Sequence, residues 1–135
     1  MQKIELIDDH HCFACGLKNL DGLRLHWEIK GQMMNTQFIP EKKYQGWQGI
    51  VHGGILATLL DEAMTRLVGA VCGSAVTAEM TVRYVMPASI GELLYVQGEI
   101  VKESRRLVEM KACIYKQNAA GALVAHAVGK AVKMV

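Results

Sequence analysis

The chain has 135 residues, of which 51% are hydrophobic, and it carries a formal net charge of +2. This length suits one domain spanning residues 1–135 with a single core, and the weak charge without a run of Lys and Arg argues against a nucleic-acid partner. The polar, acidic N-terminus is unlike a signal peptide, and no apolar stretch reaches the roughly 18 residues of a membrane span, so we expect a cytoplasmic protein with no membrane contact.

The first predicted elements are two strands joined by a tight turn. Residues 23–29 place apolar side chains at every second position, which is typical of a strand. Residues 32–39 form the predicted partner strand after a turn at Lys30-Gly31, and Pro40 ends it. Residues 41–50 mix polarity with two glycines and are predicted to form a loop.

Residues 54–71 carry the strongest helical pattern in the chain. Most positions are apolar, and Gly73 is a natural stop. Because the polar residues recur at spacings of three and four, they form one narrow stripe, and we expect a helix that is enclosed on most sides. The stripe contains Thr58, Asp61, Glu62, Thr65 and Arg66.

Four further strands are predicted at residues 76–86, 93–102, 107–116 and 122–134. In the first of them, Val76, Met80 and Val82 fall on one face and Thr77 on the other. Short connections force antiparallel pairing. One long apolar helix and one antiparallel sheet indicate an α+β fold, in which the curved sheet wraps around the central helix.

Three short motifs stand near the start of the predicted helix, at the end of the strand that follows it, and close to the N-terminus. His52-Gly53-Gly54 opens the predicted helix, and Asp61 follows the second glycine by seven positions. The segment ending in Met86-Pro87-Ala88 is followed by Gly91-Glu92, and the chain opens with Cys12-Phe13-Ala14-Cys15-Gly16.

In this order, these motifs resemble those of the PaaI-like hotdog thioesterases. The resemblance implies a hotdog fold, hydrolysis of an acyl-CoA (an aryl or medium-chain one) and assembly as a homo-oligomer, either a dimer or a dimer of dimers (a homotetramer). We expect no cofactor. A non-catalytic acyl-CoA-binding module on the same fold is the alternative function, and a hydroxyacyl dehydratase ranks below both because His52 and Glu62 lack the spacing of those enzymes.

The start of the helix and Asp61 are the predicted catalytic groups. Free N–H groups and the positive end of the helix dipole can hold a thioester oxygen, and Gly53 and Gly54 allow close approach. Asp61 is the candidate general base or nucleophile, against the simpler reading of a solvated carboxylate. Seven helical residues span about 10 Å, too far for one carbonyl to meet both groups, so we expect two copies of the chain to share each site.

His52 and Thr77 are predicted to contact the substrate or the attacking water. His52 either braces the loop before the helix or acts on the substrate, and bracing is the simpler role. The resemblance implies that Thr77 orients the water, although an ordinary strand residue is the alternative. Gln45 or Gln48 could also position water, and the sequence does not choose between them.

Cys12 and Cys15 are candidate ligands of a metal site. One Cys-x-x-Cys pair lacks the second half of a zinc site, and His10 or His11 could supply the missing ligands. A tight turn before the first strand is the simpler interpretation, so we predict no metal among the site residues.

Overall fold

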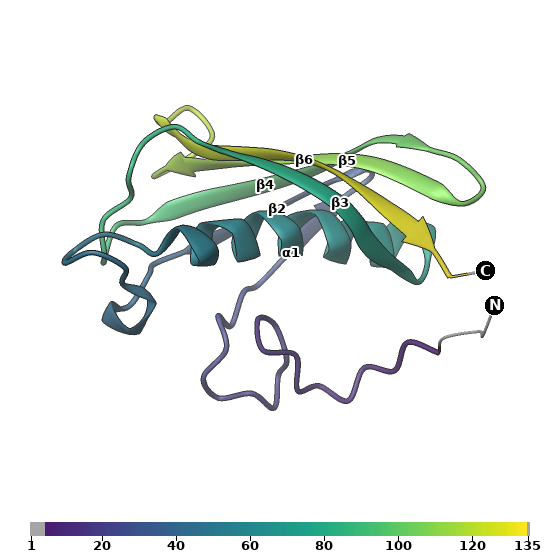
Figure 1. Ribbon diagram of the computed structural model, residues 1–135, viewed down its shortest axis with the longest axis horizontal. Helices are drawn as coiled ribbons and strands as arrows, with labels where there is room; N and C mark the ends of the chain where they lie inside the picture. The colour runs from purple at the N-terminus through teal and green to yellow at the C-terminus, as the bar shows by residue number, and fades with distance from the viewer. Residues whose placement is uncertain (1–4, 135) are drawn as a thin grey trace.

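The computed structural model describes residues 5–134 and contains one long helix and six strands (Figure 1). A single turn of 3-10 helix, η1, lies between the second strand and the long helix. In chain order the elements are β1 (Glu28–Lys30), β2 (Met33–Phe38), η1 (Lys42–Tyr44), α1 (Gly53–Cys72), β3 (Ala75–Tyr84), β4 (Leu94–Glu103), β5 (Leu107–Lys116) and β6 (Leu123–Lys133).

The six strands form one antiparallel sheet in the order β1-β2-β4-β5-β6-β3. The sheet curves over α1, and the N-terminal segment passes on the side of the helix that faces away from the sheet (Figure 1). The predicted α+β arrangement of a curved antiparallel sheet around one long helix is therefore confirmed. No helix within residues 5–134 is long and apolar enough to cross a membrane.

The core lies between α1 and the concave face of the sheet. One side of α1 contributes fully buried residues at helical spacing, and alternate residues of β4 and β5 face them, as their patterns predict. The contact is closest at Gly98 of β4, where an added Cβ would lie 2.3 Å from the carbonyl oxygen of Ala63. The helix residues concerned are Leu56, Leu59, Leu60, Ala63, Met64, Leu67 and Val68.

The far end of α1 is less enclosed than its apolar composition predicts. Gly69, Ala70 and Val71 are all exposed. The sheet covers only one side of the helix, so these apolar positions stay uncovered within a single chain.

The predicted strand at residues 23–29 is wrong for most of its length, because only Glu28–Lys30 joins the sheet. The earlier backbone groups bond elsewhere: Leu23 N–H donates to the Ala14 carbonyl, and the Thr36 hydroxyl donates to the His26 carbonyl. Arg24 also adopts a positive φ of 53°, which no strand residue has. The alternation of apolar and polar residues here reflects a loop that packs against the core, and it does not indicate pairing in the sheet.

A bulge in β3 changes which of its side chains face the helix. The pairing of β3 with β6 shifts between Thr77 and Glu79. Ala75 packs against the core before the bulge, and Met80 and Val82 do so after it. The extra residue shifts the alternation, so Thr77 faces the helix together with Met80. The predicted assignment of Thr77 and Met80 to opposite faces is therefore wrong.

Candidate active site

His52 caps the N-terminus of α1 with its side chain. Its Nδ1 accepts a hydrogen bond of 2.8 Å from the Gly54 N–H, and its carbonyl accepts from Ile55 N–H and Leu56 N–H. Because Nδ1 is the acceptor, the proton of the neutral ring resides on Nε2. His52 thus has the bracing role that the sequence predicts as its simpler function.

The Gly53 N–H is the free donor at this helix start. It donates no hydrogen bond to any group within residues 5–134, whereas Gly54 N–H is bonded to His52. The hydroxyl of Tyr84 donates to the Gly53 carbonyl at 3.0 Å, which ties the first helical turn to the end of β3. A Cβ at Gly54 would lie 3.0 Å from His52 Nδ1, so the absence of a side chain there allows the cap to form.

An open pocket of about 510 Å³ lies in front of this helix start. Gln45 lines this pocket, but its Oε1 already accepts a hydrogen bond of 2.8 Å from Gly49 N–H, which braces the loop. Gln48 is exposed. The lining residues are Gln45, Gly46, Trp47, Ile50, Val51, His52 and Gly53.

Asp61 lies in the middle of α1 and contacts β3. Its Oδ1 accepts a hydrogen bond of 2.8 Å from the Thr77 hydroxyl. Its other oxygen accepts no side-chain or backbone hydrogen bond from the described part of the chain. The carboxylate is therefore fixed at one oxygen and available at the other. The bulge that turns Thr77 toward the helix makes this contact possible.

One chain does not bring the helix start and Asp61 together. Both lie on α1, and the seven residues between Gly54 and Asp61 correspond to about 10 Å along the axis. The single chain holds these two candidate groups apart, each with its own partners: His52 and Tyr84 at the helix start, and Thr77 at Asp61.

Glu62 has an environment that the sequence pattern did not reveal. Arg66 lies one helical turn after Glu62, with 3.9 Å between Arg66 Nε and Glu62 Oε2. Burial raises the pKa of the Glu62 carboxyl, while a hydrogen bond from the Cys15 thiol and the charge of Arg66 act in the opposite direction. Burial, reinforced by the Glu62 charge, raises the pKa of the Cys15 thiol to about 12.

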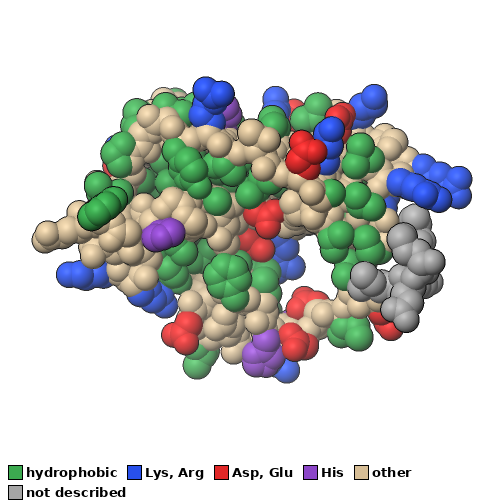
Figure 2. All heavy atoms as spheres, in the orientation of Figure 1, with side chains coloured by type: hydrophobic (Ala, Val, Ile, Leu, Met, Phe, Trp, Pro, Cys, Tyr) green, Lys and Arg blue, Asp and Glu red, His purple; other side chains and the backbone are tan. Residues whose placement is uncertain are grey.

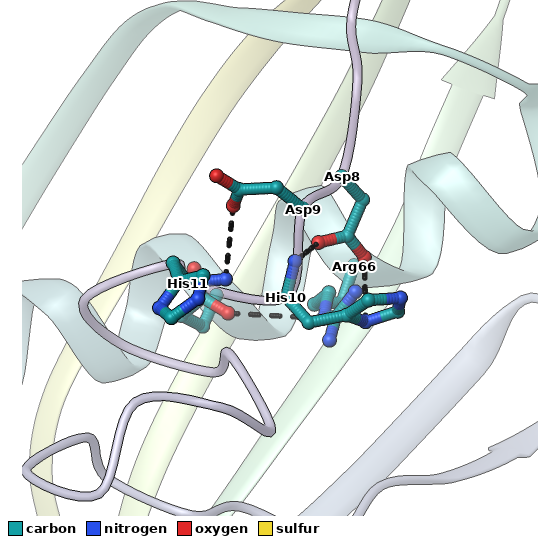
Figure 3. Close-up of polar contacts among 6 residues, drawn as sticks. Asp8, Asp9, His10, His11 and Arg66 are labelled. Atoms are coloured by element: carbon teal, nitrogen blue, oxygen red, sulfur yellow. Dashed lines mark hydrogen bonds and ion pairs between the residues drawn. The ribbon is translucent and has the colours of Figure 1, made fainter.

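Two local turns hold the segment just before the cysteine pair. Asp8 Oδ1 accepts a hydrogen bond of 2.8 Å from the backbone N–H of His10, and Asp9 Oδ1 accepts one of 3.0 Å from the backbone N–H of His11. Figure 3 shows these turns next to Arg66 of α1. Neither histidine joins the one cluster of metal-ligating atoms found within residues 5–134, which consists of Cys12, Cys15 and Glu62.

A second charged group lies at the other end of α1. Lys133 Nζ donates a hydrogen bond to Glu103 Oε2. This bond, and then one from the Cys72 thiol, lowers the pKa of Glu103. Burial and the Glu103 carboxylate raise the pKa of Cys72 in turn. This group joins β4, β6 and α1 far along the helix from Gly53, so it bears on stability.

Comparison with known families gives one match over the centre of the chain. A family model described as the thioesterase superfamily matches residues 48–123, which include His52, Asp61 and Thr77. Acyl-coenzyme A thioesterase THEM4 of Xenopus laevis is 36% identical over 73 residues, covering 53% of this chain and 32% of that protein. Acyl-coenzyme A thioesterase 13 of Mus musculus is 32% identical over 69 residues, covering 50% and 49%. The matches thus span about half the length of these curated relatives, or less.

Solved structures confirm the hotdog fold. Zebra fish thioesterase superfamily member 2 is similar with a TM-score of 0.76 at 22% identity, covering 85% of this chain and 86% of that one. A hypothetical thioesterase of Streptococcus pneumoniae solved with coenzyme A has a TM-score of 0.75 at 21% identity, covering 81% and 84%. The E. coli PaaI protein has a TM-score of 0.75 at 18% identity, covering 82% and 84%. Two further structures of the pneumococcal protein carry alanine in place of an aspartate and of a threonine sixteen positions later.

Proposed function

Because this chain belongs to the thioesterase superfamily, we propose that it hydrolyses the thioester of an acyl-CoA, with Asp61 as the catalytic carboxylate. The observation that carries the proposal is the hydrogen bond from Thr77 to Asp61, which fixes a carboxylate on the central helix and leaves one of its oxygens available. The two curated relatives, both acyl-coenzyme A thioesterases, support the choice of substrate class.

In this proposal the start of α1 polarises the thioester carbonyl. The free N–H of Gly53 donates to the carbonyl oxygen, and the positive end of the helix dipole favours the negative charge that develops there. Gly54 N–H becomes a second donor when the His52 ring turns away to admit the substrate. His52 also lines the pocket in front of the helix, so its ring is placed to contact the acyl-CoA.

Asp61 then supplies the attack on the polarised carbon. Its free oxygen either takes a proton from a water molecule that attacks the carbon and passes that proton to the departing sulfur of coenzyme A, or attacks the carbon directly. Direct attack expels coenzyme A as a thiolate, which takes its proton from solvent, and leaves a mixed anhydride that water then hydrolyses to the free acid and the Asp61 carboxylate. Thr77 holds the carboxylate in place through the other oxygen. The pair is sixteen residues apart in this chain, and the same spacing separates the aspartate and threonine replaced in the pneumococcal thioesterase variants.

The two halves of the site come together in this proposal when two copies pair along β3. This strand is at the edge of the sheet, and within residues 5–134 its backbone pairs with β6 alone. Figure 2 looks onto this side of the molecule and shows apolar side chains gathered along it. A second β3 added antiparallel would extend the sheet, cover these residues and bring Asp61 of one copy near Gly53 of the other. The exposed residues are Val71, Val76, Tyr84 and Val85.

A panel of acyl-CoA esters with a thiol-release assay tests the function. We expect the wild-type chain to release coenzyme A from at least one ester and the Asp61→Asn variant to lose about 10²-fold or more in kcat. Binding of a non-hydrolysable thioether analogue, measured by calorimetry, should change little, because the amide keeps the size and most contacts of the acid. Full activity of Asp61→Asn would contradict the catalytic assignment.

The same experiment distinguishes the alternative function. A wild-type chain that binds the analogue tightly but releases no thiol from any ester would be a non-catalytic acyl-CoA-binding module. Asp61 argues against that outcome, because a protein that only binds the ester has no need of a half-buried carboxylate held by Thr77.

A further inference from the structure

The two cysteines of the N-terminal segment meet Glu62 of α1, almost fifty residues later in the chain. The two sulfur atoms and a carboxylate oxygen of Glu62 all lie within 4.8 Å of one another. Cys12 is exposed and Cys15 is half-buried, so the cluster lies at the surface with one side open. None of the three groups takes part in the proposed hydrolysis.

The turn that presents the two sulfurs is held by its own backbone. Gly16 N–H donates to the Cys12 carbonyl at 3.0 Å, and the Asn19 amide donates to the Cys12 and Phe13 carbonyls at 3.2 and 3.1 Å. A Cβ at Gly16 would lie 2.4 Å from Cys12 N, so only glycine fits this turn. Ala14, between the cysteines, is 1% exposed and anchors the turn on the core.

The Glu62 carboxylate is aimed at this turn and is incompletely satisfied. Its side chain is 12% exposed, and Oε2 is buried without a hydrogen-bond partner within residues 5–134. The nearest cation, Arg66, is 3.9 Å from that oxygen, beyond hydrogen-bond distance. A buried carboxylate oxygen without a donor is costly, and a bound cation would relieve that cost.

We propose that Cys12, Cys15 and Glu62 form a binding site for one thiophilic divalent cation of the Zn²⁺ class. The two thiols release their protons to solvent when the metal binds, and two thiolates and a carboxylate are ligands that Zn²⁺ accepts. Tetrahedral ligands at about 2.0–2.3 Å from the metal lie roughly 3.5–3.8 Å from one another. The observed separations need only a small closing movement to reach that spacing. Water completes the fourth position on the open side.

This site differs from the one that the sequence leaves open, because its third ligand comes from α1 and not from His10 or His11. A cation there would join the N-terminal segment to the helix at the residue next to Asp61. We therefore expect it to stabilise the docking of the segment and not to take part in the proposed hydrolysis.

Cobalt and zinc titrations of the full chain, reduced with a phosphine, test the site. We expect one Zn²⁺ per chain by elemental analysis, and a thiolate-to-cobalt charge-transfer absorption when Co²⁺ is added. Cys12→Ser, Cys15→Ser and Glu62→Gln should each weaken binding roughly tenfold or more, because even outer-shell changes cost 10–100-fold at metal sites. Cys113→Ser and His10→Ala are matched controls that should bind as the wild type does.

Thermal unfolding provides a second measurement that does not depend on absorption. Zn²⁺ should raise the Tm of the wild type and of Cys113→Ser, and should leave that of Glu62→Gln unchanged. The proposal is overturned if the reduced chain takes up no metal, or if Glu62→Gln binds as tightly as the wild type. Loss of binding in His10→Ala with retention in Glu62→Gln would overturn the assignment of the third ligand.

Discussion

The hydroxyl of Thr77 on β3 donates a hydrogen bond of 2.8 Å to Oδ1 of Asp61 on α1. This bond crosses from the edge strand to the central helix and depends on a bulge that turns Thr77 inward. It therefore couples the local irregularity of one strand to the orientation of the carboxylate that we propose as catalytic.

Replacing Thr77 by valine should lower kcat by roughly 10–100-fold, because hydrogen bonds to charged groups contribute about 1.5–3 kcal/mol. Thr77→Ser keeps the hydroxyl and should retain most of the activity. Thr81→Val on the same strand is the control, since Thr81 is exposed and unconnected to Asp61. Equal activity in Thr77→Val and the wild type would show that Asp61 needs no positioning by this bond.

Replacing Gly53 by proline should remove the free N–H while keeping the helix. Proline is favoured at the first helical position, and His52 before it has φ −59° and ψ 133°, which suit a residue preceding proline. Loss of one oxyanion donor costs about 10²–10³ in kcat. Circular dichroism and the melting temperature should stay close to wild type, and a variant that folds and remains fully active would exclude Gly53 N–H as the donor.

Mixing two inactive variants should restore activity if two copies share each site. Gly53→Pro and Asp61→Asn damage opposite halves, so a mixed dimer contains one intact site and one doubly damaged site. Random exchange in a twofold dimer would return about a quarter of wild-type activity. The mixture is assayed after unfolding and refolding together. Activity no greater than that of the separately refolded variants would contradict a shared site.

Replacing His52 by alanine should destabilise the fold by about 1 kcal/mol, the usual cost of losing an N-cap acceptor. His52→Asn should restore the cap and hence the free energy of unfolding, measured in urea. It should still raise KM for the acyl-CoA, because the imidazole that lines the pocket is absent. His26→Ala, at an exposed loop position, controls for loss of a histidine. Unchanged KM in His52→Asn would leave His52 with the capping role alone.

The Glu103–Lys133 pair should make the free energy of unfolding decrease as the pH falls into the acid range. Hydrogen bonds from Lys133 and Cys72 lower the pKa of Glu103 in the folded chain, so folding favours its charged form. The stabilisation is therefore present above the usual glutamate pKa of about 4.3 and disappears as the pH falls through the lowered value. Urea midpoints of the wild type and Glu103→Gln should differ at neutral pH and converge in acid, and Glu28→Gln should follow the wild type throughout.

Elements with a regular local pattern could be predicted closely from the sequence. The expected helix at residues 54–71 is Gly53–Cys72, and the expected strand at 107–116 is Leu107–Lys116. In both elements the apolar residues recur at the period of the element, because one face packs on the core. The strand expected at 23–29 failed because a loop folded over the core can show the same alternation as a strand.

The candidate site was only partly predictable for the same reason. His52, Gly53, Gly54 and Asp61 lie within one short segment whose spacing is visible in the sequence. The bulge that turns Thr77 inward has no local signature, and the approach of Cys15 to Glu62 depends on where the N-terminal segment docks. Such contacts between distant parts of the chain follow from tertiary packing and not from periodicity.

Gly98 of β4 sets how close α1 comes to the sheet, because a methyl group there would collide with the Ala63 carbonyl. Ala63 is two residues beyond Asp61 on the same helix, so a side chain at position 98 would push this stretch of α1 away from β4. We expect that movement to disturb the hydrogen bond between Asp61 and Thr77, which has a length of 2.8 Å with the helix in its present place. The position of the Asp61 carboxylate is therefore expected to depend on the absence of a side chain at Gly98, on the buried side of the helix.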